Sequence, residues 1–267
     1  MGTKDYTTLE ITQRERIQAL RLIDDEFMTA CFDGNIEATE LLLRIVLDRE
    51  DLKVKKVTTQ KAMKNLQGRD IYLDIDAVDS NGSEIDIEIQ RANQGADRKR
   101  ARYHSSIMDA HLLKPGDDFK SLPETYVIFI TEKDIIGQDR PLYAFERQDI
   151  RTGEPFNDGT HIVYVNGSKR NARTKLGKLM HDFFCTDPNK MYYKLLAERA
   201  KYFKEEEKGA RYMGSVMDEI RKEAVDATKI EAAKNILKSG KMSVEEIAEV
   251  LSLPIEEVEA LLNQKTA

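Results

Sequence analysis

Apolar and polar residues alternate along residues 72–79 and again along residues 84–90. A period of two is typical of β-strands that bury one face. Residues 80–82, between the two runs, are Ser-Asn-Gly, which favours a turn. The pattern therefore predicts a β-hairpin in the first third of the chain.

The register of this hairpin follows from how its side chains sort. A two-residue turn at Asn81-Gly82 would mix acidic and aliphatic side chains on both faces. A three-residue loop, with Gly82 in the left-handed conformation, pairs Asp79 with Ser83 and separates the two kinds of side chain. We predict this loop, because a slip of one residue turns every side chain to the other face. The apolar face then comprises Leu73, Ile75, Ala77, Ile85, Ile87 and Ile89, and the polar face comprises Asp74, Asp76, Glu84, Asp86, Glu88 and Gln90.

Helical and strand patterns continue on both sides of the hairpin and predict an α/β fold. Residues 126–131 are an uninterrupted apolar run, which indicates a strand buried on both faces. Pro115-Gly116 ends the helix that precedes it. The other predicted elements are helices over residues 8–32, 36–47, 97–113 and 172–184, an edge strand over 53–59, and strands over 142–145 and 161–165.

The C-terminal part is charged, rich in alanine and helical from residue 190 to 238. Gly240 ends a helix, Ser243 and Glu246 form a capping box for the next, and Pro254 begins the last. We therefore predict an α/β domain over residues 1–187 and a helical tail over residues 188–267.

The end of this tail, residues 232–262, resembles a helix-turn-helix. A helix that reads DNA is expected to carry cations, whereas this last helix carries Glu256, Glu257 and Glu259. We favour an interaction or regulatory module, which offers a route to a homodimer, and keep sequence-specific DNA reading as the alternative.

We predict that this chain of 267 residues is cytoplasmic. Cys31 and Cys185 are too few and too far apart for a disulfide framework or a zinc site, so a reducing compartment is expected. The first six residues lack the apolar core of a signal peptide. No run approaches the roughly 18 apolar residues of a membrane span, so no membrane partner is expected.

The formal net charge of −6 is unevenly distributed. Residues 91–114 and 168–178 are basic and each follows an apolar strand, where they could flank a phosphate backbone. Ordinary solvated helix faces are the alternative, but the neighbouring acidic hairpin favours phosphate contacts. His104 is expected to be structural, with a phosphate contact as its alternative. The candidate DNA-binding residues are Arg98, Arg100, Arg102, Lys169, Arg170 and Arg173.

The polar face of the hairpin carries the candidate chemistry. The predicted register places Asp74 across from Glu88, with Cβ atoms about 5 Å apart. At this distance the two carboxylates would repel each other unless they share a hard divalent cation. A solvated acidic face of an antiparallel sheet remains the alternative.

These motifs resemble the PD-(D/E)xK nuclease superfamily, and within it the recombination-promoting nucleases, also described as putative transposases. The resemblance covers residues 25–170. It implies a restriction-endonuclease-like mixed central sheet flanked by helices. The matching segments, in order, are Leu42-Leu43-Arg44-Ile45-Val46-Leu47, Leu73-Asp74, Ile87-Glu88-Ile89-Gln90, Arg100-Ala101-Arg102-Tyr103 and Tyr126-Val127-Ile128-Phe129-Ile130.

The resemblance also implies roles for individual residues. Asp74 and Glu88 would bind Mg²⁺, for which Mn²⁺ can substitute, and Gln90 stands where the superfamily has a lysine. A lysine can stabilise negative charge on phosphate, whereas Gln90 can only orient water by hydrogen bonds. In the superfamily a helix acid often completes the metal site, and Glu40 is the candidate here; its alternative is an i,i+4 pair with Arg44.

The sequence thus predicts a metal-dependent endonuclease that hydrolyses DNA phosphodiester bonds and promotes recombination or transposition. Two alternatives stay open: a catalytically weak DNA-binding protein of the same fold, and an interaction protein whose acidic hairpin is only surface. Cleavage and metal binding distinguish the three.

Overall fold

The computed structural model describes residues 8–65, 68–91, 93–240 and 242–263. The chain forms two compact units, residues 1–213 and residues 214–267. No helix in these described ranges is long and apolar enough to cross a membrane.

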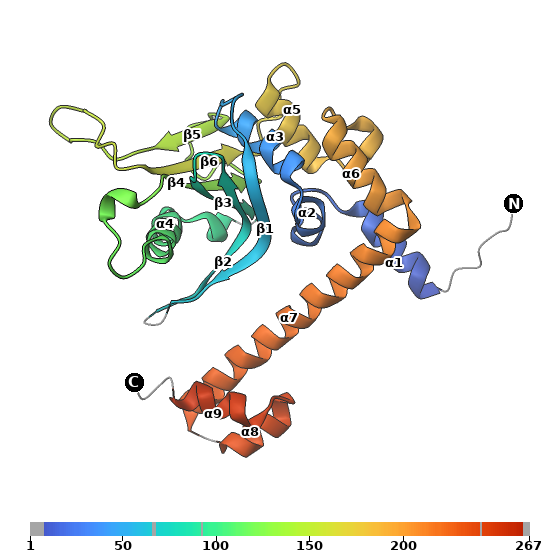
Figure 1. Ribbon diagram of the computed structural model, residues 1–267. Coiled ribbons are helices and arrows are strands. Elements are labelled where there is room, and N and C mark those ends of the chain that lie inside the picture. Colours follow the sequence, from blue (N-terminus) through green and yellow to red (C-terminus); the bar gives the residue numbers. More distant parts are fainter. Residues whose placement is uncertain (1–7, 66–67, 92, 241, 264–267) are drawn as a thin grey trace, which may run out of the picture. The chain divides into compact units, whose positions relative to one another are not determined.

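The first unit is built around a mixed sheet of six strands in its described residues (Figure 1). The strand order is β1-β2-β3-β4-β6-β5. Neighbours are antiparallel from β1 to β3, parallel from β3 through β4 to β6, and antiparallel between β6 and β5. The strands are β1 (Val54–Met63), β2 (Ile71–Asp79), β3 (Glu84–Gln90), β4 (Thr125–Thr131), β5 (Leu142–Phe145) and β6 (Thr160–Asn166). This architecture confirms the predicted α/β fold with a mixed central sheet.

Helices cover both faces of the sheet (Figure 1). On one face lie α2 (Asp25–Phe32), α3 (Ile36–Val46) and α5 (Lys175–Phe184), and on the other lies α4 (Arg98–Leu112). Three short 3₁₀ turns connect elements at η1 (Asn93–Ala96), η2 (Phe119–Ser121) and η3 (Pro188–Lys190).

Local capping explains where several helices begin. Thr174 accepts a hydrogen bond from the backbone N–H of Gly177 at 3.0 Å, so α5 begins at Lys175 and not at residue 172 as predicted. The predicted helix over residues 8–32 is two helices, α1 (Thr8–Ala19) and α2. They separate where Asp24 accepts from the backbone N–H of Arg21 at 2.8 Å.

The β2–β3 hairpin has the predicted register. Ile75 pairs with Ile87 and Ala77 with Ile85. The backbone N–H of Asp79 donates to Ser83 O at 3.1 Å, and Gly82 has a φ of +89°. The three-residue loop and the register from Val78–Glu84 to Ile75–Ile87 are confirmed. The predicted sorting is wrong at Leu73, which packs with Val127 and Phe129 on the face of Asp86 and Glu88, because the regular pairing ends at Ile75.

The acidic face of the hairpin is buried at Asp76, Asp86 and Glu88, which rules out the alternative of a solvated face there. Asp76, Asp86 and Glu88 are each at most 1% exposed. The parallel register places Glu88 beside Phe129 of β4, so this face of the sheet is the one that α4 covers. The strand pattern gave the correct alternation, but it did not reveal the helix above the polar side chains.

The helical region that follows α5 divides later than the predicted boundary at residue 187. The predicted helix over 190–238 is α6 (Lys194–Glu205) and α7 (Glu207–Ser239), separated at the extended residue Glu206. Phe203 of α6 is 1% exposed and lies edge-on to Phe27 of α2, with ring centroids 6.3 Å apart. The Lys204 ammonium donates to Leu20 O at 2.6 Å. Helix α6 is therefore part of the first unit.

The second unit contains most of α7, α8 (Val244–Leu251) and α9 (Ile255–Asn263). Ser243 and Glu246 form the predicted capping box, and Gly240 has a φ of +64° where α7 has ended. A small core of Ala233, Ile247, Ala248 and Val258 joins the three helices. The three helices are as predicted, and their likeness to a helix-turn-helix stays a prediction.

These packing relations predict how truncation affects stability. A chain that ends at residue 187 lacks α6 and with it the buried side chains of Leu196 and Phe203. Removing a buried Phe or Leu side chain costs about 2–5 kcal/mol. The two losses together are comparable to a typical domain stability of about 5–15 kcal/mol. We expect this chain to be unfolded or to melt far below the full chain. A chain that ends at residue 222 keeps α6 and should melt close to the full chain. Thermal unfolding followed by circular dichroism checks this, and equal melting of both truncated chains would contradict it.

Candidate active site

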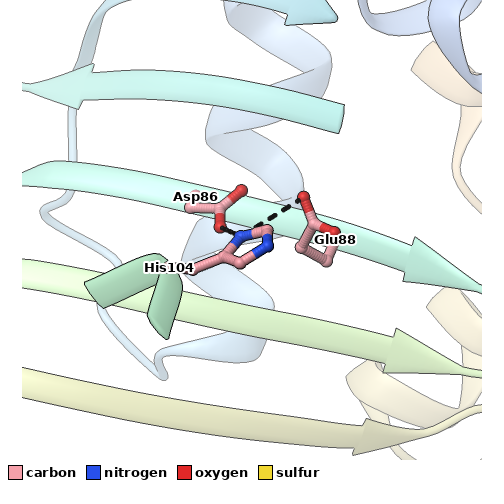
Figure 2. Close-up of side chains that lie close together, drawn as sticks. All are labelled: Asp86, Glu88 and His104. Atoms are coloured by element: carbon pink, nitrogen blue, oxygen red, sulfur yellow. Dashed lines mark hydrogen bonds and ion pairs between the residues drawn. The ribbon is translucent and has the colours of Figure 1, made fainter. Parts of the chain in front are cut away.

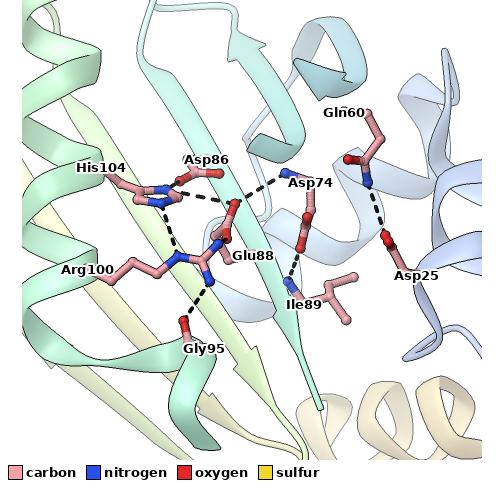
Figure 3. A network of polar contacts seen from close by, with 9 residues as sticks. All are labelled: Asp25, Gln60, Asp74, Asp86, Glu88, Ile89, Gly95, Arg100 and His104. Atoms are coloured by element: carbon pink, nitrogen blue, oxygen red, sulfur yellow. Dashed lines mark hydrogen bonds and ion pairs between the residues drawn. The ribbon is translucent and has the colours of Figure 1, made fainter. Parts of the chain in front are cut away.

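The carboxylates of Asp74 and Glu88 each accept a backbone hydrogen bond where strands β2 and β3 separate. The β2–β3 ladder extends from Val78–Glu84 to Ile75–Ile87. Beyond it, the backbone N–H of Asp74 donates to Glu88 Oε1 at 3.2 Å, and the backbone N–H of Ile89 donates to Asp74 Oδ2 at 2.8 Å (Figure 3). Side-chain oxygens thus take the place of backbone acceptors, which fixes both carboxylates at the fork.

Helix α4 adds an imidazole and a guanidinium to this fork. Arg100 Nη2 lies 2.5 Å from Glu88 Oε2, and Arg100 Nε donates to His104 Nε2 at 3.2 Å. Because His104 Nε2 accepts, we assign the imidazole proton to Nδ1, which then donates to Asp86 Oδ2 at 2.9 Å (Figure 2). Asp86, Glu88, Arg100 and His104 therefore form one hydrogen-bonded network.

Burial makes this network electrostatically unfavourable in its fully ionised form. Burial and the neighbouring Glu88 charge raise the pKa of Asp74, and burial and the Asp74 charge raise the pKa of Asp86. Burial and the Asp86 charge raise the pKa of Glu88 to about 8. Burial lowers the pKa of His104, so its imidazole is neutral. Of the carboxylates of Asp74, Asp86 and Glu88, that of Glu88 contacts the Arg100 guanidinium. When all three are ionised, the network has an excess of negative charge and favours an additional cation.

The donor set fits a divalent cation. One ligand atom each from Asp86, Glu88 and His104 lies within 4.8 Å of the others. Asp86 Oδ1 is buried and has no hydrogen-bond partner among the described residues. Carboxylate oxygens suit Mg²⁺ and Mn²⁺. A nitrogen of His104 would join them only on giving up its present hydrogen bond to Asp86 or Arg100. Asp74 lies one hydrogen bond away from this set, through Glu88.

Gln90 lies at the end of β3, against Gly95 of the turn η1. A Cβ atom on Gly95 would overlap the Gln90 side-chain amide. Gly95 also offers its carbonyl oxygen to Arg100 Nη1 at 2.9 Å. The absence of a side chain at Gly95 thus leaves room for Gln90 and Arg100 to approach the same turn.

Glu40 lies outside this network. Its carboxylate pairs with Arg44 at 2.6 Å and with Lys53 at 3.2 Å, and accepts from the backbone N–H of Val54 at 3.1 Å. Val54 is opposite Asp79, which is five residues from Asp74, or about 16 Å along an extended strand. The i,i+4 pair with Arg44 is what the structure contains, and Glu40 does not join Asp74 and Glu88.

Asp25 of α2 is an acid near the fork that sequence reasoning missed. Its charge contributes to the raised pKa of Asp74, and it accepts from Gln60 Nε2 at 3.0 Å (Figure 3). Asp25 and Asp74 are brought together by the fold alone, so no local pattern signals their proximity.

From the sequence, Asp86 had no role beyond its place on the polar face, and His104 was expected to be structural, with a phosphate contact as its alternative. Asp86 shares the polar face with Glu88, and His104 is four residues after Arg100, which puts both on one face of α4. The strand alternation and the helix spacing could have predicted these two pairs. The contact between Asp86 on the strand and His104 on the helix could not be predicted from the sequence.

The candidate DNA-binding residues fall into two groups. Arg100 is engaged in the network, whereas Arg98, Arg102 and Arg173 are exposed. Lys169 pairs with Asp139 at 2.5 Å, and Arg170 lies over the Phe184 ring, 3.6 Å from its centroid. Strands β3, β4 and β6 are parallel, so the basic segments that follow β3 and β6 begin at the same edge of the sheet as Gln90.

The raised pKa of Glu88 predicts a pH-dependent stability of the metal-free protein. Between its ordinary value of 4.5 and about 8, folded Glu88 binds a proton that unfolded Glu88 has released. The free energy of unfolding should therefore fall as pH rises through this window, by at most about 1.4 kcal/mol per pH unit for one group. Urea unfolding in EDTA at several pH values measures this slope. Glu88→Gln should make the free energy of unfolding depend less steeply on pH. An unchanged slope in that variant would contradict the raised pKa of Glu88.

Comparison with known proteins agrees with this geometry. A family model described as PD-(D/E)XK nuclease family transposase matches residues 32–236, well over half of the chain. No curated protein and no solved structure matches. The fold and the family match together confirm the resemblance drawn from the hairpin motifs. The chain belongs to the PD-(D/E)XK nuclease family transposases.

Proposed function

We propose that this protein hydrolyses DNA phosphodiester bonds with a divalent cation, Mg²⁺ or Mn²⁺, and acts in recombination or transposition. The observation that carries the proposal is the group of buried carboxylates at the β2–β3 fork, two of them fixed by backbone N–H groups. The raised pKa values of Asp74 and Glu88 favour a bound cation over an empty fork. Family membership supports a nuclease reaction on DNA.

In this proposal Asp74 and Glu88 hold the cation through carboxylate oxygens, with Asp86 and His104 beside them. When bound, a divalent cation polarises the phosphate and lowers the pKa of a water molecule. The Gln90 amide orients the attacking water by hydrogen bonds. The water oxygen would bond to phosphorus while the bond to the leaving sugar oxygen breaks; the water would release a proton to solvent and the leaving oxygen would take one up. Glu40, which is engaged with Arg44, has no part in this scheme.

DNA would lie along the sheet edge where β3 and β6 end. Arg98, Arg102 and Arg173 are exposed near the start of the segments that follow these strands, so they are the proposed contacts to the phosphate backbone. Lys169 and Arg170 would contribute after exchanging their present partners. A homodimer through the helical tail of residues 188–267 and a cytoplasmic location stay predictions from the sequence.

The second candidate is a DNA-binding protein of the same fold with weak or no catalysis. The neutral Gln90, in the place of the superfamily lysine, favours this alternative. DNA binding without metal-dependent cleavage would establish it, whereas absence of both would leave an interaction protein.

Asp74→Asn tests the metal-dependent reaction. Asparagine keeps an oxygen that accepts from Ile89 N–H but removes the charge, so nicking of supercoiled plasmid with Mg²⁺ or Mn²⁺ should fall by at least about 1,000-fold. The fold should persist, because the change also removes repulsion with Glu88. Wild type in EDTA and Asp149→Asn, at an exposed loop acid, are the controls. Nicking at the wild-type rate by folded Asp74→Asn protein would refute the assignment.

Gly95→Ala tests Gln90 without changing its chemistry. The new methyl group must displace the Gln90 amide, which is the far end of a flexible side chain, so the fold should tolerate the change. We expect cleavage to slow by about 10- to 1,000-fold, as for Gln90→Ala, because water positioning is lost in both. The melting temperature and the cleavage rate are measured together. A full rate in Gly95→Ala, with slow cleavage in Gln90→Ala, would contradict the proposed place of the amide.

A further inference from the structure

The active-site motif of this chain lacks the positive charge that a lysine would supply. Gln90 has only amide hydrogen bonds to offer. Arg100 is the permanently charged partner of Glu88 in the described ion pairs, and it comes from α4, not from the strand. The charge missing from the motif is thus present in the same site on another element.

Three acceptors hold the Arg100 guanidinium at the fork. They are Glu88 Oε2 at 2.5 Å, Gly95 O at 2.9 Å and His104 Nε2 at 3.2 Å (Figure 3). The Arg100 side chain is 36% exposed, whereas Glu88 is fully buried. The Arg100 side chain therefore binds the buried carboxylate and is still partly accessible, so a substrate phosphate can approach it.

Gly95 brings Arg100 and Gln90 to one place. The position of a Cβ on Gly95 overlaps the Gln90 amide and is 3.5 Å from Arg100 Nη1. The amide in the motif position and the guanidinium from α4 therefore lie close together. Between them they offer what one lysine ammonium offers, a hydrogen-bond donor and a positive charge.

Arg100 and a metal ion would compete for Glu88. In the present network both Glu88 oxygens are engaged, Oε2 by Arg100 and Oε1 by the backbone N–H of Asp74. A cation that binds Glu88 weakens the hold of this carboxylate on Arg100. Gly95 O and His104 Nε2 do not carry a charge, so they would keep the guanidinium nearby without neutralising it.

We propose that Arg100 is a catalytic residue that takes over the charge role of the missing lysine, by contacting a non-bridging oxygen of the phosphodiester that is cut. This inference rests on the proposed nuclease function. A guanidinium can donate two parallel hydrogen bonds to phosphate, and its charge stabilises the charge that develops on the phosphate oxygens during hydrolysis.

A purely structural role for Arg100 makes the opposite prediction for metal affinity. If Arg100 only neutralises buried Glu88, its loss disorganises the site, and metal binding and cleavage weaken together. If Arg100 competes with the metal and acts on the phosphate, its loss leaves metal binding equal or tighter while cleavage falls.

The experiment measures Mn²⁺ binding by electron paramagnetic resonance and plasmid nicking at saturating Mn²⁺ for wild type, Arg100→Gln and Arg100→Lys. For Arg100→Gln we expect cleavage about 100- to 1,000-fold slower, as on loss of one charge-stabilising donor, with Mn²⁺ affinity unchanged or higher. Arg100→Lys keeps the charge but loses the two-donor fork, so it should cleave faster than Arg100→Gln and more slowly than wild type. Lys120→Gln, at an exposed lysine of η2 outside both basic segments, is the matched control and should cleave at the wild-type rate.

A second-site variant makes the test specific. Gln90→Lys combined with Arg100→Gln restores a positive charge at the motif position and should cleave at least about 10-fold faster than Arg100→Gln alone. Nicking by Arg100→Gln within about threefold of wild type overturns the proposal for Arg100 and leaves the nuclease function standing. Weaker Mn²⁺ binding in Arg100→Gln, with cleavage restored by more Mn²⁺, also overturns it. A wild-type protein that binds no Mn²⁺ and cuts no DNA refutes the nuclease function and this proposal together.

Discussion

The gathering of three carboxylates at one point of the sheet, two of them fully buried, is the constraint on which the first unit depends. Asp86 and Glu88 have no exposed surface, and their pKa values are raised, as is that of Asp74. Charge in such a place needs a proton, a guanidinium or a metal ion. The network supplies a single guanidinium contact, from Arg100. The site is therefore least stable when it is ionised and without a cation, and cation binding and folding are coupled through the same residues.

The sheet topology explains why these acids are buried. Strands β3 and β4 are parallel neighbours, and parallel neighbours need a long crossover that is usually a helix. Helix α4 is that crossover, and it covers the face on which Asp86 and Glu88 lie. The crossover that joins the two strands thus also delivers Arg100 and His104 to the acids.

Local chemistry made the hairpin predictable. Alternation and the Ser-Asn-Gly loop determine the register around Gly82, and capping residues such as Ser243 determine where helices begin. These features depend on residues a few positions apart. They do not depend on what packs above the strand, so the burial of the polar face could not be predicted from them.

Long-range contacts account for what the sequence left open. Glu40 had two plausible roles, and the nearby Arg44, Lys53 and Val54 N–H decide between them. Asp25 approaches Asp74 only because α2 packs against the sheet. The boundary at residue 187 followed a change in composition, whereas α6 is charged on its outer side and buries Phe203 on its inner side. Composition averages over these two faces and misses the packing.

The buried acids also change the meaning of the net charge. The formal value of −6 counts every carboxylate as ionised, including Glu88, with a pKa of about 8, and Asp76, with a pKa of about 6. With a divalent cation bound, the charges of Asp74, Asp86, Glu88 and Arg100 sum to zero with the ion. These acids would then present no net negative charge to a phosphate backbone. The surface that DNA meets is set by exposed side chains at the sheet edge, so an acidic chain is compatible with a polyanionic substrate.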